Sequence, residues 1–192
     1  RPRVKAQLID TCGTGGGVLT FNVSTANALI AAAANVPVAK HGSRSISHRS
    51  GSADVLEKLG VNINLTKHQA EKLIEEVGFA FLYAPLFHPV MSKVLGPESK
   101  LGIKTIFYTV IGPLINPAHV KAHVLGVYRQ QLVEPVAHVL AKLGYVKALV
   151  VHGMDGLDEI SNTGPTLVAE VRNGKLSDIY EITPEQFNIQ RA

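Results

Sequence analysis

Short apolar runs alternate along this chain with segments in which apolar residues recur every three to four positions, and this alternation predicts an α/β domain. The short runs are expected to form strands, and the periodic segments helices. The expected strands cover residues 4–10, 36–39, 79–83 and 148–152, and the expected helices cover residues 23–34, 52–59, 67–77 and 132–143. The predicted fold class is α/β, with a central mixed, largely parallel sheet flanked by helices.

Capping and turn residues sharpen several of these boundaries. Thr66 followed by Gln69 predicts a capping box at the start of one helix. Gly60 and Gly144 are expected to end two others. The dipeptide Asn173-Gly174 separates two stretches of alternating apolar and polar residues, 168–171 and 176–180, which is typical of a β-hairpin. We expect one α/β domain over residues 1–192.

The chemistry concentrates between residues 10 and 57. Residues 13–17 read Gly-Thr-Gly-Gly-Gly, and we call them the glycine loop. Small hydroxyl groups follow at the start of the helix over 23–34, and the cations Lys40, Arg44 and Arg49 come next. A glycine-rich turn aims backbone N–H groups at anions, and a helix N-terminus adds partial positive charge. The spacing matches neither a P-loop nor a dinucleotide fingerprint, so a flexible turn is the alternative for the glycine loop alone.

Composition and charge narrow the classes of protein. The chain has 192 residues, of which 46% are hydrophobic and 18% charged, a composition ordinary for a globular domain. The net charge is +4 and the pI about 9.2. The sequence has no block of consecutive basic residues of the kind that indicates nucleic-acid binding. Cys12 is the single cysteine, which suits a reducing cytoplasm. The apolar stretch over 28–34 is too short to span a membrane.

Ligands of open α/β sheets gather beyond the carboxyl ends of strands. The glycine loop, Lys40 with His41, and the adjacent carboxylates Asp158 and Glu159 all follow expected strands. Mg²⁺ prefers oxygen ligands and bridges to substrate phosphates, so the carboxylate pair is a candidate Mg²⁺ site. Taken alone, an Asp-Glu pair more often belongs to a solvated turn.

Eight blocks of sequence, in order, resemble the anthranilate phosphoribosyltransferase family: residues 10–16, 21–25, 38–42, 50–56, 87–89, 101–105, 112–117 and 156–161. The resemblance implies a fold like that of nucleoside phosphorylases and phosphoribosyltransferases. It also implies a glycosyltransferase that moves phosphoribosyl from phosphoribosyl pyrophosphate (PRPP) to the amine of anthranilate in tryptophan biosynthesis. The family carries a helical segment before Arg1 and helices beyond Ala192, so we expect a partial chain of a cytoplasmic homodimer, with no membrane and no nucleic-acid partner.

The resemblance also assigns roles to residues. It implies no catalytic acid or base, because positioning and electrostatics suffice for this transfer. The residues implied for PRPP are Gly13, Gly16, Thr20, Asn22, Ser24, Thr25, Lys40 and Ser52. Those implied for anthranilate are Gly13, His41, Ser43 and Glu98, with His88 and Pro113 shaping its slot, and those for Mg²⁺ are Ser24, Asp158 and Glu159.

Several positions depart from the family. Gly17 replaces an aspartate in a loop one residue shorter, Ser43 replaces an asparagine, and Glu98 stands where an arginine meets anthranilate. Lys104 is the nearby candidate for a replacement cation, and residues 108–111 hold one extra residue. Two alternatives remain open: an enzyme like pyrimidine nucleoside phosphorylase, and a non-catalytic homologue that binds nucleic acid.

Overall fold

The computed structural model describes residues 2–18, 20–44, 50–89, 91–101 and 105–192. The chain divides into two compact units, and each is described by itself. Unit 1 comprises Arg1–Cys12 and Phe21–Val120, and unit 2 comprises Gly13–Thr20 and Lys121–Ala192. The glycine loop therefore belongs to unit 2, although the chain on both sides of it belongs to unit 1.

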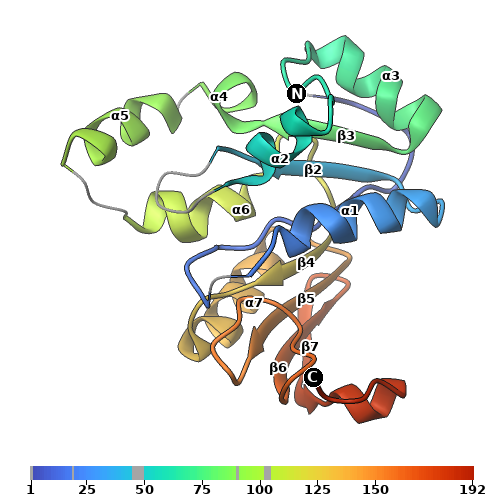
Figure 1. Cartoon of the computed structure of the whole chain (residues 1–192), viewed down its shortest axis with the longest axis vertical. Helices are drawn as coiled ribbons and strands as arrows, with labels where there is room; N and C mark the ends of the chain where they lie inside the picture. Colours follow the sequence, from blue (N-terminus) through green and yellow to red (C-terminus); the bar gives the residue numbers. More distant parts are fainter. Residues whose placement is uncertain (1, 19, 45–49, 90, 102–104) are drawn as a thin grey trace. The chain divides into compact units, whose positions relative to one another are not determined.

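Unit 1 is a parallel three-stranded sheet, in the order β3-β2-β1, with helices packed on it (Figure 1). Helix α1 contacts β2, and α3 contacts β3. Its elements are β1 (Ile9–Asp10), α1 (Val23–Ala33), β2 (Val38–Gly42), α2 (Ser52–Lys58), α3 (Lys67–Val77), β3 (Phe79–Tyr83), α4 (Ala84–Phe87), α5 (Met91–Leu101), the π-helix η1 (Phe107–Ile111) and α6 (Gly112–Leu114).

Unit 2 is a mixed sheet in which β4 and β5 run parallel while β5, β6 and β7 are antiparallel. Helix α7 packs against β5, β6 and β7 through a buried face that includes Val136 and Leu140 (Figure 1). The elements are β4 (Ala122–Gly126), the 3₁₀-helix η2 (Gln130–Leu132), α7 (Val133–Lys142), β5 (Lys147–Gly153), β6 (Thr166–Arg172), β7 (Lys175–Ile182) and the 3₁₀-helix η3 (Pro184–Phe187).

Local signals placed several boundaries correctly. Thr66 Oγ1 accepts from the backbone N–H of Gln69 at 3.3 Å, and the Gln69 side chain accepts from the N–H of Thr66 at 2.8 Å. The predicted capping box is therefore confirmed. The predicted hairpin is β6 and β7. Its turn residues Asn173 and Gly174 have φ of 49° and 73°, and a type I′ turn requires such positive values at both positions.

Two strand predictions need correction. The expected strand over residues 4–10 shrinks to β1, because the partner β2 begins only at Val38. Pro37 has no N–H to extend the ladder, and the residues before it form the end of α1 and a turn. For the same reason the strand expected over 36–39 is shifted to Val38–Gly42, which places Lys40 inside it. Strand β4 was not predicted.

The extra residue noted in 108–111 coincides with the π-helix η1. The N–H of Gly112 bonds to the carbonyl of Phe107, five positions earlier. An α-helical bond spans four positions, so the wider turn accommodates one additional residue without breaking the helix.

Candidate functional site

In unit 1 the candidate site is organised around a buried lysine. Lys40 lies in β2 with a side chain that is 0% exposed, and its Nζ donates to Ser24 Oγ at 3.0 Å. Ser24 stands in the first turn of α1. Within the described part of the chain, no carboxylate forms an ion pair with Lys40. Burying a charge without a counter-ion is costly, so this position favours a bound anion.

A second polar group lies in the first turn of the same helix. Thr25 is 2% exposed, and among the described residues its Oγ1 has no hydrogen-bond partner. Buried hydroxyl groups normally have a hydrogen-bond partner, so this one is available to bond a ligand oxygen. Ser24, which accepts from Lys40 Nζ, and Thr25 therefore provide two hydroxyl groups in the first turn of one helix, a position that suits phosphate oxygens.

A buried aspartate fixes the ends of β1 and β2. Asp10 is 0% exposed, and its Oδ1 accepts from the backbone N–H groups of Thr11, Cys12 and His41 at 2.7, 3.0 and 3.3 Å. Its Oδ2 accepts from Asn116 Nδ2 at 2.7 Å, and the same nitrogen donates to the carbonyl of Ala39 at 2.8 Å. We call these groups the Asp10 network. Its backbone contacts hold the segment that carries Lys40 and His41.

The basic residues near Lys40 do not act alike. Arg44 reaches Asp54 and Glu57, at 3.0 and 2.8 Å, from its Nη1. Hydrogen bonds from Arg44 hold the pKa of Glu57 below its ordinary value. The guanidinium is thus already engaged by carboxylates on α2, whereas no carboxylate among the described residues pairs with Lys40. Arg49, the third cation of the predicted group, lies outside the described residues.

Ser50, two residues before α2, contacts the start of α1. Ser50 Oγ donates to Asn22 Oδ1 at 3.2 Å, and Asn22 Nδ2 donates to the Ser50 carbonyl at 3.4 Å. Asn22 is the residue that precedes α1, and Ser52 is the first residue of α2. Sequence predicted roles for Asn22 and Ser52 but not for Ser50, which joins their two segments.

The residues expected to meet anthranilate are only partly described. His41 is buried in β2, and its ring stacks edge-to-face against His88 with centroids 4.6 Å apart. Ser43 Oγ donates to the carbonyl of Arg44 at 3.1 Å. Glu98 lies in α5 with its side chain outside the described part, and Lys104 lies outside the described residues altogether. Pro113 is buried in α6.

In unit 2 the glycine loop docks on the end of β4. The N–H of Thr14 donates to the carbonyl of Gly126 at 2.9 Å, and the N–H of Tyr128 donates to Thr14 Oγ1 at 3.1 Å. Gly15 and Gly16 have φ of 62° and 89°, a conformation that residues with a Cβ rarely adopt. Gly13 also belongs to this unit, and Thr20 is exposed at the end of the segment.

The glycine loop also meets the segment of the carboxylate pair. The N–H of Val18 donates to the carbonyl of Gly156 at 3.2 Å. A Cβ added at Gly17 would lie 2.7 Å from Asp158 Oδ1 and 2.8 Å from the backbone nitrogen of Asp158. A side chain at position 17 would therefore clash with Asp158, so this backbone arrangement requires glycine there. It also places a predicted phosphate-binding loop beside a predicted metal ligand, within one unit.

Asp158 and Glu159 are both half-buried in the segment between β5 and β6. In the described ranges no group of three or more His, Cys, Asp or Glu side chains could hold a metal ion. Two carboxylates nonetheless fit Mg²⁺, which keeps several waters and takes further oxygens from a bound phosphate. Ser24, the third predicted ligand, belongs to unit 1 and accepts from the ammonium of Lys40.

Residues 5–192 match the family model described as glycosyl transferase family, a/b domain. The chain therefore belongs to that glycosyl transferase family. It is 54% identical to an anthranilate phosphoribosyltransferase of Methanosarcina acetivorans, over 100% of this chain and 51% of that protein. It is 55% identical to one from a Thermoanaerobacter species, over 96% and 54%. The predicted resemblance is confirmed, and the chain spans about half the length of the curated relatives it matches.

Solved structures agree with the predicted fold class. An anthranilate phosphoribosyltransferase from Thermus thermophilus superposes with a TM-score of 0.90 at 45% identity, covering 100% of this chain and 57% of that one. The Saccharomyces cerevisiae enzyme in complex with PRPP and Mg superposes with a TM-score of 0.86 at 33% identity, covering 99% and 52%. Among the residues that the structure describes, no helix has the length and apolar character needed to cross a bilayer.

Proposed function

We propose that this chain is the PRPP-binding α/β portion of an anthranilate phosphoribosyltransferase. The reaction would transfer the phosphoribosyl group of PRPP to the amine of anthranilate, release pyrophosphate and serve tryptophan biosynthesis. The relatives named above carry this activity in their names. A structure of the yeast relative in complex with PRPP and Mg, and another in complex with 4-fluoroanthranilate, suggest the same ligands for this chain. A homodimer remains part of the proposal for the longer protein.

The observation that carries the proposal is the buried ammonium of Lys40, which has a hydroxyl partner and no carboxylate partner in the described part of the chain. A phosphate oxygen would supply the missing negative charge. Ser24, Thr25 and Asn22 at the start of α1 would supply hydrogen bonds to phosphate and ribose, and Ser52 would do so at the start of α2.

The glycine loop, with Gly13 and Gly16, would bind pyrophosphate through backbone N–H groups. Asp158 and Glu159 would hold Mg²⁺, which when bound neutralises charge on the pyrophosphate leaving group. Thr20, at the end of the same segment, is a further proposed PRPP contact. These contacts are proposed for unit 2, where the loop and Asp158 already touch.

The chemistry requires little from acid–base groups. As the bond from C1 to pyrophosphate breaks, positive charge develops on the ribose and negative charge on the leaving group. Anthranilate brings a ready amine nucleophile, so we assign no residue as a proton acceptor. The proposed contributions of the chain are orientation of PRPP and stabilisation of the departing charge.

The nucleoside phosphorylase alternative would use Lys40 for free phosphate. The pair Asp158 and Glu159, and the names of the relatives, favour the transferase. The nucleic-acid alternative rests on the pI of about 9.2. A free basic patch around Arg44 is not supported, because the Arg44 guanidinium is already paired with Asp54 and Glu57.

The test is calorimetric titration of the chain with PRPP, with and without Mg²⁺, followed by anthranilate. We expect PRPP binding that strengthens with Mg²⁺. Binding of phosphate and a nucleoside in place of PRPP would support the phosphorylase. Salt-dependent DNA binding without PRPP binding would support the nucleic-acid homologue.

Glu98 makes the proposed acceptor site testable by itself. A carboxylate at the position of the family's arginine should repel anthranilate, and it lacks the bidentate fork of a guanidinium. We expect Glu98→Arg to lower the KM for anthranilate by about tenfold, because one charge-assisted hydrogen bond contributes roughly that factor to binding. The KM for PRPP should stay unchanged. Steady-state kinetics in the longer protein measure both. Strong anthranilate use without any gain from Glu98→Arg would mean that another cation has this role.

A further inference from the structure

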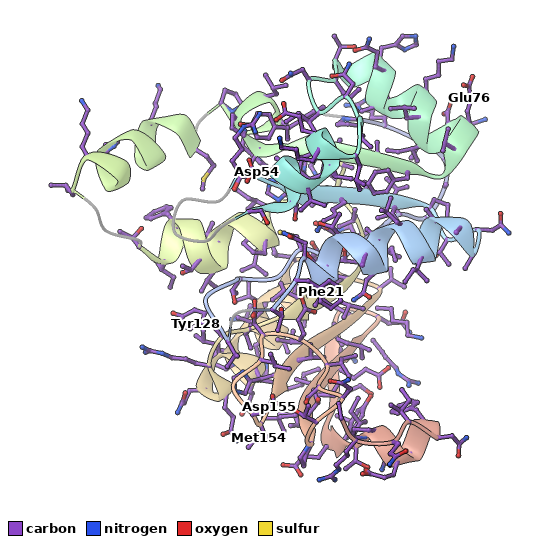
Figure 2. The ribbon with its side chains drawn as sticks, in the orientation of Figure 1. Phe21, Asp54, Glu76, Tyr128, Met154 and Asp155 are labelled. Atoms are coloured by element: carbon purple, nitrogen blue, oxygen red, sulfur yellow. The ribbon has the colours of Figure 1, made fainter. Side chains whose placement is uncertain are left out.

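The segment between β5 and β6 is closed by a carboxylate and two hydroxyl groups. Asp155 Oδ2 accepts hydrogen bonds from Ser161 Oγ and from Thr163 Oγ1. Ser161 Oγ in turn accepts from the backbone N–H groups of Thr163 and Gly164, both at 3.0 Å. We call Asp155, Ser161 and Thr163 the Asp155 clamp. Figure 2 shows Asp155 beside Met154, in the segment that follows β5.

The clamp joins the two ends of a short stretch whose middle carries Asp158 and Glu159. Inside it, the N–H of Leu157 donates to Asp155 Oδ1 at 3.3 Å. The carbonyl of Leu157 accepts from the N–H of Gly153, at the end of β5, at 2.9 Å. The residues just before Asp158 are therefore held by the clamp on one side and by the strand on the other.

The far end of the stretch is anchored as well. Ser161 is 5% exposed, and its N–H donates to Thr166 Oγ1 at 2.9 Å, which ties it to the first residue of β6. Asp158 also lies against Gly17 of the glycine loop. A carboxylate pair restrained on both flanks loses less conformational freedom when it binds a cation than one on an open loop.

We propose that Asp155, Ser161 and Thr163 are positioning residues that preorganise Asp158 and Glu159 for Mg²⁺ and pyrophosphate. This inference rests on the proposed function. The clamp would not touch the metal; it acts by fixing the backbone from which both ligands project. Burial raises the pKa of Asp155, but hydrogen bonds from Ser161 and Thr163 outweigh it and hold the pKa below its ordinary value. The acceptor is therefore ionised at neutral pH.

The test compares variants that remove or keep single groups of the clamp. Asp155→Asn removes the charge, Thr163→Val removes a hydroxyl at nearly constant shape, and Thr163→Ser keeps the hydroxyl. Glu181→Gln, at an exposed position in β7, is the matched control for loss of a carboxylate. Thr163 is exposed, so its variants should fold. They can therefore test the clamp even if Asp155→Asn does not fold.

The first readout is calorimetric PRPP binding over a series of Mg²⁺ concentrations. Changes to groups that orient metal ligands typically cost about 10- to 100-fold in metal affinity. We expect the half-effective Mg²⁺ concentration to rise about tenfold in Asp155→Asn and by a smaller factor in Thr163→Val. Thr163→Ser and Glu181→Gln should behave like the unmodified chain. The second readout is amide exchange without metal, which should accelerate at Gly156 and Leu157 but not in β5 or β6.

The outcomes separate the two proposals. If the unmodified chain binds PRPP with Mg²⁺ and the clamp variants share its Mg²⁺ dependence, the clamp is only structural and the inference is overturned while the proposed function stands. A lower melting temperature without a change in Mg²⁺ dependence leads to the same conclusion. If the unmodified chain shows no Mg²⁺-dependent PRPP binding, both proposals fail.

Discussion

Two aspartates, Asp10 in unit 1 and Asp155 in unit 2, each hold together the backbone beyond the carboxyl end of a strand. Asp10 is fully buried and is bound by three backbone N–H groups and the amide of Asn116. Asp155 is exposed and is bound mainly by two side-chain hydroxyl groups. The same carboxylate chemistry therefore serves two surroundings that differ in solvent access.

The difference in burial between Asp10 and Asp155 predicts that their removal will affect the stability of the two units differently. Removing a buried acceptor leaves its donors without water, which costs stability of the whole unit. Removing an exposed acceptor lets water replace it, so the loss should appear locally, in the order of the segment it closed. The proposed ligand groups differ in a similar way: unit 1 offers a buried cation, Lys40, and unit 2 offers two half-buried carboxylates.

The largest effect should come from Asp10→Asn. Its new NH₂ group would face an N–H donor, and a hydrogen bond to a charged group is worth about 1.5–3 kcal/mol. We expect the free energy of unfolding to fall by about 3 kcal/mol, against about 1 kcal/mol or less for Asp155→Asn. Urea unfolding measures both. Equal losses would remove the contrast between the two aspartates.

Lys40→Met tests the buried cation of unit 1. Loss of a charge-assisted hydrogen bond should weaken PRPP binding by about 10- to 100-fold. The ligand-free chain should become more stable, by about 1 kcal/mol, because an uncompensated buried charge is removed. Lys72→Met, at an exposed site on α3, is the control for charge alone. Calorimetry and thermal melting report the two effects, and a loss of stability in Lys40→Met would contradict the assignment of an anion site.

The double variant Asp158→Asn with Glu159→Gln tests the carboxylates of unit 2. Mg²⁺ holds oxygen ligands by charge, so we expect PRPP binding to lose most of its Mg²⁺ dependence, about tenfold at saturating metal. Melting should change little, since both side chains are only half-buried. PRPP titrations with and without Mg²⁺ measure this. Unchanged Mg²⁺ dependence would remove both residues from the metal site.

The smallest effect concerns pH. Hydrogen bonding keeps the pKa of Asp155 below its ordinary value of 3.8. The sign follows from linkage: its contribution to stability is fully present above that ordinary value and is lost as pH falls through the lowered one. The difference in melting temperature between the unmodified chain and Asp155→Asn should thus stay constant from neutral to mildly acidic pH, and shrink only near pH 3.8 and below. A difference in melting temperature that already decreases near neutral pH would contradict this prediction.

Signals that act over a few residues were sufficient for much of the fold. The capping box at Thr66 and the hairpin turn at Asn173 and Gly174 were both predicted correctly, because each is complete within a short stretch. The bounds of β2 were misjudged, because the strand starts two residues later than expected, after Pro37, where it pairs with β3. Strand β4, a five-residue segment defined by its pairing with β5, was missed.

The candidate site likewise contains features that sequence could predict and features that it could not. Motif residues such as Lys40 and Asp158 could be proposed from sequence, but their surroundings could not. The hydrogen bond between Asp10 and Asn116 joins residues 106 positions apart, and no local sequence pattern predicts it. Sequence singled out Asn116 and Ser161 only as members of the family-like blocks 112–117 and 156–161. The single-domain expectation for residues 1–192 stays a prediction beside the two compact units.

The membership of the glycine loop in unit 2 has a consequence for the order of synthesis. Thr14 leaves the ribosome more than a hundred residues before its partner Gly126, so this loop must wait, undocked, while most of the chain is made. No single cut can separate the two units, because the chain passes between them three times, at 12–13, 20–21 and 120–121. An attempt to express unit 2 from Lys121 onward would leave out the glycine loop. A permuted gene that places residues 13–20 next to that unit is the way to obtain it whole.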